Sequence, residues 1–170
     1  MHYLLDMDGV LVDSKEAWFR AFQETGDVPR DVFENDYWGR DLKANLRDLD
    51  TSAAEFCDTV FSRHIEGIEL MPGAREVLSV LGGRKALITN TTGRCTARIL
   101  QAHGLAGYFD AVVTSDLVER GKPEPDLVQR AMAEIAARPR ETIVIGDSPE
   151  DIQAGRAAGC TTIGIGTEGD

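Results

Sequence analysis

Short apolar runs alternate with amphipathic stretches from Met71 onward, and this alternation constrains the fold more than any other feature. The apolar runs predict strands at 86–88, 111–113, 142–145 and 162–165, and a further strand at 3–5. The stretches between the later runs predict helices over 72–81, 94–103, 125–137 and 149–158. Strands that alternate with helices are typical of a parallel sheet covered by helices on both faces. We therefore expect an α/β fold with a doubly wound parallel sheet.

The segment 14–70 has a different pattern and predicts a small helical insertion after the first strand. It is rich in Asp, Glu, Arg and aromatic residues and lacks long β-branched runs. An apolar stripe at helical spacing runs from Ala17 to Phe22, and Asp13 or Ser14 can cap that helix. We expect two to four helices here. The predicted organisation is an α/β core of 1–13 and 71–170 with a small helical cap of 14–70.

Composition narrows the partners that the protein can have. The 170 residues fit one domain, and the formal net charge of −11 argues against nucleic acid or an anionic membrane surface as a partner. No apolar run approaches the roughly 18 residues that a membrane span needs. The first predicted strand begins almost at Met1 and carries acidic residues, so we expect no signal peptide and a cytoplasmic location.

The three cysteines, Cys57, Cys95 and Cys160, lie far apart and form neither a Cys-x-x-Cys pair nor a zinc-binding spacing. Small buried hydrophobic residues in a reducing compartment are the favoured interpretation.

Two aspartates directly follow the first predicted strand. Asp6 and Asp8 lie two residues apart, and Gly9 comes next, where a sharp turn needs no side chain. Two close carboxylates repel each other, and a divalent cation relieves that repulsion because hard cations prefer oxygen ligands. A pair of solvated aspartates in a turn is the ordinary alternative, and for an isolated Asp-x-Asp it would be favoured.

Three later segments place further polar groups at the same edge of the predicted sheet. Thr89 and Asn90 end a strand and can donate to phosphate oxygens. Asp147 can complete a metal site with Asp6, while Asp151, one helical turn later, can bind through water or orient its neighbours. Lys122 lies in a loop that two prolines stiffen and can supply a point charge. Each segment alone reads as a turn, a helix cap or a surface loop. Together, at one sheet edge, they are hard to explain by structure alone.

In this order the four motifs resemble those of the haloacid dehalogenase-like (HAD) hydrolase superfamily. The first, Asp-x-Asp-Gly-x-x-x-Asp, stands at 6–13, and the second, an apolar strand ending in Thr, stands at 87–90. The third is Lys122 in Gly-Lys-Pro-Glu-Pro-Asp, and the fourth is Gly-Asp-Ser-Pro-Glu-Asp at 146–151. The insertion is similar to a shortened helical cap of the phosphoglycolate phosphatase and β-phosphoglucomutase branch. The resemblance implies a Rossmann-like core.

The resemblance also implies a reaction. Asp6 would be the nucleophile that forms an aspartyl-phosphate, and Asp8 would be the general acid and then the base. Thr89, Asn90 and Lys122 would bind the phosphoryl group. Mg²⁺ would be held by Asp6, the backbone carbonyl of Asp8, and Asp147, with Asp151 in the outer shell. We therefore expect a Mg²⁺-dependent phosphatase acting on a small phosphorylated metabolite.

Cap residues resemble a substrate-contacting loop of that branch. The matching stretch is 38–43, so Arg40 and Lys43 are candidate substrate-binding residues. A solvated basic turn beside the acids Asp36 and Asp41 explains the same residues at least as well. Trp18 and Trp38 are expected in the core of the cap rather than in contact with substrate.

Two other functions remain open. A phosphomutase of the β-phosphoglucomutase type would use the same motifs, but the mutase members carry a His in the helix after the first motif, and 15–19 contains none. A non-catalytic phosphate-binding or partner-binding protein is the second alternative, and an intact set of Asp6, Asp8, Lys122 and Asp147 argues against it. A monomer or a homodimer fits either function.

Overall fold

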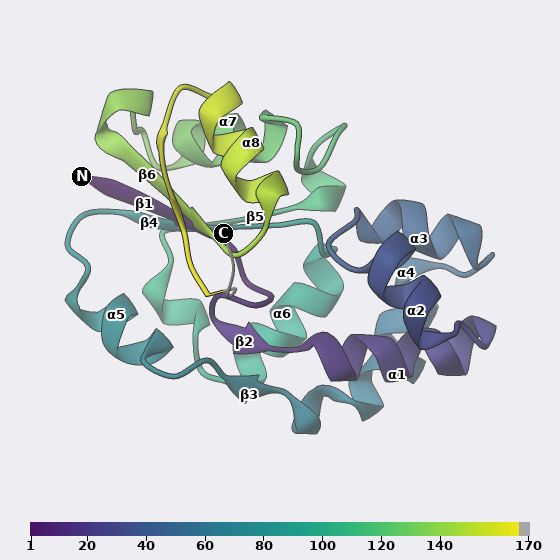
Figure 1. The fold of residues 1–170 in the computed structure, drawn as a ribbon. Coiled ribbons are helices and arrows are strands. Elements are labelled where there is room, and N and C mark those ends of the chain that lie inside the picture. The colour runs from purple at the N-terminus through teal and green to yellow at the C-terminus, as the bar shows by residue number, and fades with distance from the viewer. Residues whose placement is uncertain (167–170) are drawn as a thin grey trace.

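The computed structural model describes residues 1–166, and its centre is a five-stranded parallel sheet (Figure 1). The strands, in the order in which they lie across the sheet, are β5 (Ala111–Thr114), β4 (Lys85–Thr89), β1 (His2–Leu5), β6 (Thr142–Gly146) and β7 (Thr161–Gly164). In the central strand, Leu5 pairs with Leu87 on one side and Ile145 on the other. The predicted α/β class and parallel sheet are confirmed.

Helices cover both faces of the sheet. The helices α5 (Ala74–Val80) and α6 (Gly93–Ala102) lie on one face, and α7 (Asp126–Glu134) and α8 (Pro149–Ala157) lie on the other (Figure 1). Successive strand residues point to opposite faces, so Leu4 packs among residues of α7 while Leu5 packs among residues of α5 and α6. Burial on both faces explains why the strands read as continuous apolar runs.

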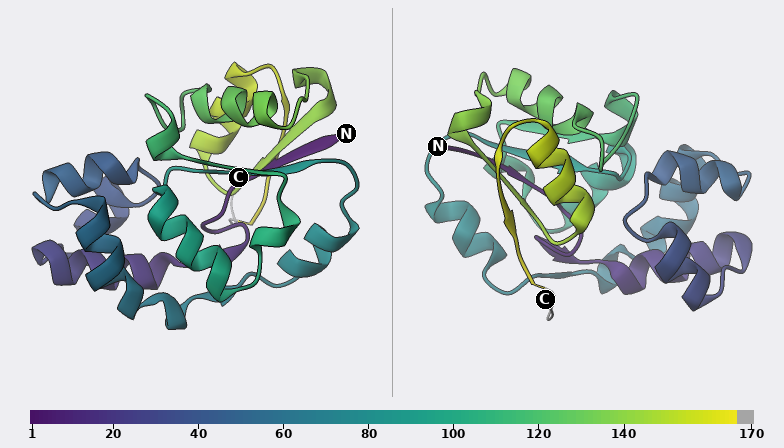
Figure 2. Two further views of the ribbon diagram at one scale, coloured as in Figure 1. Left: turned by 180° about the vertical axis from the view of Figure 1, so that it is seen from behind. Right: turned by 45° about the horizontal axis from the view of Figure 1, so that its top comes forward.

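The segment 14–70, called the cap below, contains only helical elements between its ends and lies beyond one end of the sheet (Figure 2). Its α-helices are α1 (Lys15–Gly26), α2 (Arg30–Val32), α3 (Leu42–Asp48) and α4 (Ala53–Glu55). Two π-helical segments, Phe33–Tyr37 and Phe56–Val60, extend α2 and α4. Single 3₁₀ turns stand at Phe61–Arg63 and Ile65–Gly67, and in the core at Ala106–Tyr108, Ser115–Leu117 and Pro139–Glu141.

A two-stranded antiparallel ribbon joins the cap to the core. Its strands are β2 (Val12–Asp13) and β3 (Glu69–Leu70), with Val12 opposite Leu70. The chain therefore leaves the core and returns to it along neighbouring backbone. Sequence analysis did not predict this ribbon, because two residues are too few to show an alternating pattern.

A disulfide bond joins the cap to the core, and the expectation of three unpaired cysteines is wrong for two of them. Cys57 in the cap is bonded to Cys95 on α6, with 5.3 Å between their Cα atoms. Their separation of 38 residues in sequence carries no signal, because the pairing depends on how the cap packs against α6. Cys160 is a free, partly buried thiol whose sulfur lies 3.6 Å from that of Met132, and burial raises its pKa.

Ion pairs reinforce the same cap–core interface. Asp58, next to the disulfide, pairs with Arg94 at 2.7 Å and with Arg98 at 2.6 Å, both on α6. Hydrogen bonds from these two guanidinium groups lower the pKa of Asp58 to about 2.

Within residues 1–166, no helix combines the length and the apolar character that a membrane crossing requires.

Candidate active site

One cavity of about 330 Å³ lies between the carboxyl ends of the strands and the cap. Parallel strands gather their carboxyl ends at one edge of a sheet, which is where ligands bind in such folds. Here β1 leads into Asp6, β4 ends in Thr89, and β6 leads into Asp147. The predicted site residues that line this cavity are Asp6, Asp8, Arg40, Thr89, Asn90, Lys122 and Asp147.

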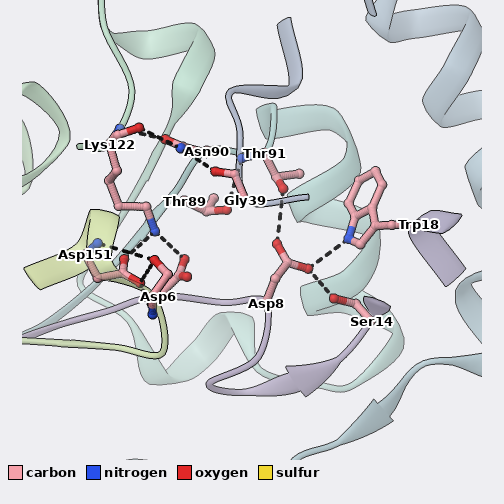
Figure 3. Close-up of polar contacts among 11 residues, drawn as sticks. Asp6, Asp8, Ser14, Trp18, Gly39, Thr89, Asn90, Thr91, Lys122 and Asp151 are labelled. Carbon is pink, nitrogen blue, oxygen red and sulfur yellow. Dashed lines mark hydrogen bonds and ion pairs between the residues drawn. The ribbon is translucent and has the colours of Figure 1, made fainter. Parts of the chain in front are cut away.

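Lys122 is the central cation of the site. Its Nζ lies 2.7 Å from Oδ1 of Asp6 and 2.7 Å from Oδ1 of Asp151 (Figure 3). All three side chains are nearly inaccessible to solvent. Burial alone would lower the pKa of the Lys122 ammonium, but the two carboxylates outweigh burial and raise it. Lys122 therefore stays charged at neutral pH.

Three carboxylates face one another around this ammonium. Asp6, Asp147 and Asp151 each offer an oxygen, and these oxygens lie within 4.8 Å of one another. Burial raises the pKa of Asp6 well above its ordinary value against the pull of Lys122. Burial, and then the charge of Asp151, raises the pKa of Asp147 to about 6. One ammonium does not balance three carboxylates, so a divalent cation with a preference for oxygen ligands fits the cluster.

Asp151 also caps the start of helix α8. Its Oδ2 accepts hydrogen bonds from Oγ of Ser148 at 2.7 Å and from the backbone N–H of Ser148 at 3.2 Å. The backbone N–H of Asp151 in turn donates to the Ser148 hydroxyl at 3.4 Å, and together with the Ser148 N–H contact this forms a capping box at the start of α8. With Oδ1 on Lys122 and Oδ2 on Ser148, Asp151 orients the ammonium from a fixed position. The Ser-x-x-Asp spacing in the sequence is the signal for this box.

The side chain of Asp8 turns away from the carboxylate cluster (Figure 3). Its Oδ1 accepts hydrogen bonds from the hydroxyl of Ser14 and, at 2.9 Å, from Nε1 of Trp18. Its Oδ2 accepts a third bond from the hydroxyl of Thr91 at 3.2 Å. Ser14 does occupy the N-cap position of α1, but its hydroxyl bonds to Asp8 and not to the helix. Sequence analysis did not identify these three donors as part of the site.

Thr89 and Asn90 have different surroundings. The hydroxyl oxygen of Thr89 accepts the backbone N–H of Thr91 at 3.1 Å, which leaves its own proton to donate. The amide of Asn90 is already engaged: it donates to the carbonyls of Gly39 at 2.9 Å and Lys122 at 3.0 Å and accepts the Lys122 N–H at 2.7 Å. Asn90 therefore ties the cap loop to the loop that carries Lys122.

Of the two candidate substrate-binding residues of the cap, one lines the cavity and the other does not. Arg40 lines the cavity, but its guanidinium is paired with Asp48 at 2.7 Å. Lys43 is not among the lining residues; its ammonium donates to the backbone carbonyls of Ser115 and, at 3.1 Å, Val118. The structure thus brings Arg40 to the cavity and uses Lys43 as a link between cap and core.

Two glycines are needed for the close approach of the acids. Gly9 has a φ of 78°, and a side chain there would also collide with the carboxylate of Asp147. A side chain on Gly146 would collide with Asp151. Gly9 therefore makes room for a carboxylate from another motif, and Gly146 makes room for one from its own.

Comparisons with known proteins agree with this geometry. Residues 3–165 match the family model described as haloacid dehalogenase-like hydrolase. The chain is 32% identical to hexitol phosphatase A of Escherichia coli, covering 99% of this chain and 84% of the relative. It is 27% identical to pyrophosphatase PpaX of Halalkalibacterium halodurans, covering 96% and 82%. A solved hydrolase from Pseudomonas syringae superimposes with a TM-score of 0.79 at 26% identity, covering 96% and 84%.

Proposed function

The chain belongs to the haloacid dehalogenase-like hydrolase family, and from that premise we propose that it is a Mg²⁺-dependent phosphatase that acts on a small phosphorylated metabolite through an aspartyl-phosphate. The contact between Asp6 and Lys122 carries this proposal. The buried carboxylate of Asp6 lies 2.7 Å from the buried ammonium of Lys122, which holds it in one orientation directly after β1. It faces a cavity that Thr89 and Asp8 also line.

In the first step, a carboxylate oxygen of Asp6 attacks phosphorus and the bond to the leaving oxygen breaks. Lys122 and the Thr89 hydroxyl contact the phosphoryl oxygens, on which negative charge is concentrated. Because Lys122 is anchored by Asp151, this charge needs no rearrangement during the reaction. Positioning and charge neutralisation supply most of the catalysis in phosphoryl transfer.

Asp8 acts as the general acid and then as the general base. In its acid form it donates a proton to the departing oxygen, and the resulting carboxylate then removes a proton from the water that hydrolyses the aspartyl-phosphate. The leaving alcohol and inorganic phosphate are the products, and Asp6 is regenerated. The three donors around Asp8 hold it on the cap side of the site, where the leaving group would lie.

Mg²⁺ would be held by Asp6, Asp147 and the backbone carbonyl of Asp8, since the Asp8 side chain is engaged elsewhere. Asp151, the third member of the carboxylate cluster, would act from the outer shell through Lys122 and Ser148. When bound, Mg²⁺ would offset the excess negative charge of the cluster and allow an anionic phosphate to approach.

Phosphate release from a panel of esters tests the proposal. The panel includes hexitol phosphates and pyrophosphate, because relatives carry those activities in their names. We expect release with Mg²⁺, none with EDTA, and none from Asp6→Asn. Asp31→Asn, an exposed aspartate of α2 outside the cavity, is the matched control and should retain activity. Release that survives in Asp6→Asn would contradict the proposed nucleophile.

The phosphomutase alternative predicts a different product, an isomeric phosphate ester without free phosphate. The position of Trp18 weighs against it. An indole N–H can donate a hydrogen bond to Asp8 but cannot act as a general acid or base at neutral pH, and none of the described residues that line the cavity is a histidine. A non-catalytic binding protein would release no phosphate from any ester.

The division into a core and a cap, the monomeric or dimeric state and the cytoplasmic location stay predictions. The Cys57–Cys95 bond bears on the last of these, because disulfides are rare in a reducing cytoplasm. Mass spectrometry of protein from cells quenched in acid, with its thiols alkylated after unfolding, tests the location directly, because both cysteines are buried in the folded protein. Two modified thiols at Cys57 and Cys95 would support a reducing compartment, and their absence would contradict it.

A further inference from the structure

The cavity has two chemically different sides. The sheet side carries the catalytic aspartates, Thr89 and Lys122, whereas the cap side is mostly aromatic and aliphatic. The apolar residues that the cap contributes are Trp18, Phe22, Phe33, Tyr37, Trp38 and Leu42. A phosphoryl group that reaches Asp6 would direct its leaving group toward this second side. The cap side therefore selects the leaving group.

The aromatic rings of the cap form a continuous wall. Phe22 lies 5.6 Å from Phe33 and 5.3 Å from Tyr37, and Phe33 lies 5.9 Å from Trp38, measured between ring centroids. Phe22 and Phe33 are buried behind the surface, while Tyr37 and Trp38 are only half-buried. Mutual packing holds these rings in place, so the apolar surface of Tyr37 and Trp38 is preformed.

The cap offers little positive charge to a polyanionic leaving group. Arg40 is the one cation of the cap among the described lining residues, and it is paired with Asp48. The ammonium of Lys43 is bound to core carbonyls. The sheet side adds carboxylates, among them Glu150, so a second phosphate on the substrate would meet no unpaired cation among the described cap residues that line the cavity.

Few hydrogen-bonding groups stand on the cap side. The amide nitrogen of Asn45 donates to the carbonyl of Tyr37, and its Oδ1 is buried without a partner among the described residues. The indole N–H of Trp18 is used by Asp8, which leaves the Tyr37 hydroxyl and the Trp38 indole N–H as donors. A polyol carries more hydroxyl groups than these can receive, and hydroxyl groups that lose water without a partner disfavour binding. A cavity of about 330 Å³ also limits the leaving group to a small one.

From this arrangement we propose that the preferred substrate is a phosphate monoester of a small alcohol that bears an aromatic or comparably flat apolar group, which packs against Tyr37 and Trp38. This inference rests on the proposed phosphatase function and names its substrate class. Trp38 is then a specificity-determining residue.

Two esters of primary alcohols test the inference without a difference in leaving-group chemistry. Benzyl phosphate carries an aromatic ring, and glycerol 3-phosphate carries hydroxyl groups in its place. We expect kcat/KM for benzyl phosphate to exceed that for glycerol 3-phosphate by about tenfold or more, the range in which apolar pockets discriminate. Pyrophosphate should be the poorest of the three. Equal or reversed preference would overturn the inference.

Substitution of Trp38 locates the preference. In Trp38→Gln we expect the ratio of kcat/KM for the two esters to fall about fivefold, since the flat apolar surface is lost. Trp38→Phe keeps an aromatic ring and should preserve the ratio within about twofold. Both variants are checked for folding by circular dichroism. An unchanged ratio in a folded Trp38→Gln protein would refute the role of Trp38.

A binding measurement separates this inference from the phosphatase proposal. Both tryptophans of the chain line the cavity, so their fluorescence reports its occupancy. In Asp6→Asn with Mg²⁺ we expect benzyl phosphate to bind about tenfold more tightly than glycerol 3-phosphate. If the native protein hydrolyses no ester of the panel, the phosphatase proposal fails, and this ratio still decides the inference. Tighter or equal binding of glycerol 3-phosphate would refute it.

Discussion

The indole N–H of Trp18 donates a hydrogen bond of 2.9 Å to the carboxylate of Asp8, so the first helix of the cap holds a side chain that follows the first strand of the core. The ring of Trp18 is itself fixed, because it stacks on Phe61 with 3.8 Å between centroids. A rigid donor on the cap thus sets the direction in which the proposed general acid points.

Trp18→Phe tests this positioning role. We expect kcat/KM for alkyl phosphates to fall roughly tenfold, since a hydrogen bond to a charged group is worth about 1.5–3 kcal/mol. For 4-nitrophenyl phosphate the loss should be smaller, because nitrophenolate departs without a proton. A merely structural role of Trp18 would lower both values by the same factor, and that outcome would contradict positioning. Thr91→Val, which removes the donor to the other oxygen of Asp8, should show the same dependence on the leaving group.

Loss of Lys122 should destabilise the folded protein as well as abolish its activity. In Lys122→Met the buried carboxylates of Asp6 and Asp151 lose their common cation, so we expect the free energy of unfolding in EDTA to fall by roughly 3 kcal/mol. Urea denaturation measures this change. Arg130→Met is the control: Arg130 is exposed and pairs with Glu134 at 2.6 Å, so its loss should cost less than about 0.5 kcal/mol. Equal effects in the two variants would show that the buried network contributes nothing to stability.

Magnesium binding should depend on pH through Asp147. Its pKa is about 6 in the folded protein against an ordinary 3.8. Between these values the metal-free folded protein keeps a proton that the unfolded chain releases. The stability that this group gives the metal-free protein is therefore present below pH 4 and is lost as pH rises toward 6. Mg²⁺ binds the ionised form and competes with that proton.

The observable is the rise in melting temperature that Mg²⁺ causes relative to EDTA. We expect a clear rise at pH 7.5 that disappears by about pH 5, because a ligand stabilises a protein only in proportion to its binding. Asp147→Asn should show little or no rise at either pH. A rise of the same size at pH 5 and pH 7.5 would rule out proton competition at Asp147.

Reduction of the Cys57–Cys95 bond should destabilise the protein. Closing a loop of 38 residues stabilises a fold by roughly 2–4 kcal/mol, so we expect dithiothreitol to lower the free energy of unfolding by about that amount. The double variant Cys57→Ser/Cys95→Ser should match the reduced native protein and be insensitive to dithiothreitol. Cys160→Ser, which removes the free thiol, should leave the effect of reduction intact.

Thiol counting supplies an independent check of the disulfide. Unfolded without a reductant, the protein should expose one reactive thiol per chain, and after reduction it should expose three. Three reactive thiols without reduction would show that the bond does not form.

The sheet could be predicted from the sequence because its signal is local. The residues of β1, β4 and β6 are apolar on both faces, and chemically distinctive residues such as Asp6 and Thr89 follow at the point where each strand ends. Parallel topology then brings those ends together without any knowledge of side-chain packing.

The contacts of the cap could not be predicted, because they depend on angles between elements. Whether Trp18 reaches Asp8 depends on how α1 leaves β2, and the ammonium of Lys43 turns to core carbonyls because α3 lies beside residues 115–118. The pairing of Cys57 with Cys95 has the same origin. Amphipathic spacing shows which face of a helix is buried but not which partner it meets.

The short β2–β3 ribbon has a consequence for how such a protein can change. Asp13 and Glu69 lie opposite each other on antiparallel strands, so a tight turn could join them and close the core without the residues between. None of the strands of the five-stranded sheet comes from the cap. Insertions, deletions or a wholly different segment at this junction would leave the sheet edge that carries Asp6, Thr89 and Asp147 with the same connectivity. The proposed selectivity for the leaving group and the proposed phosphoryl chemistry can therefore evolve separately within one chain.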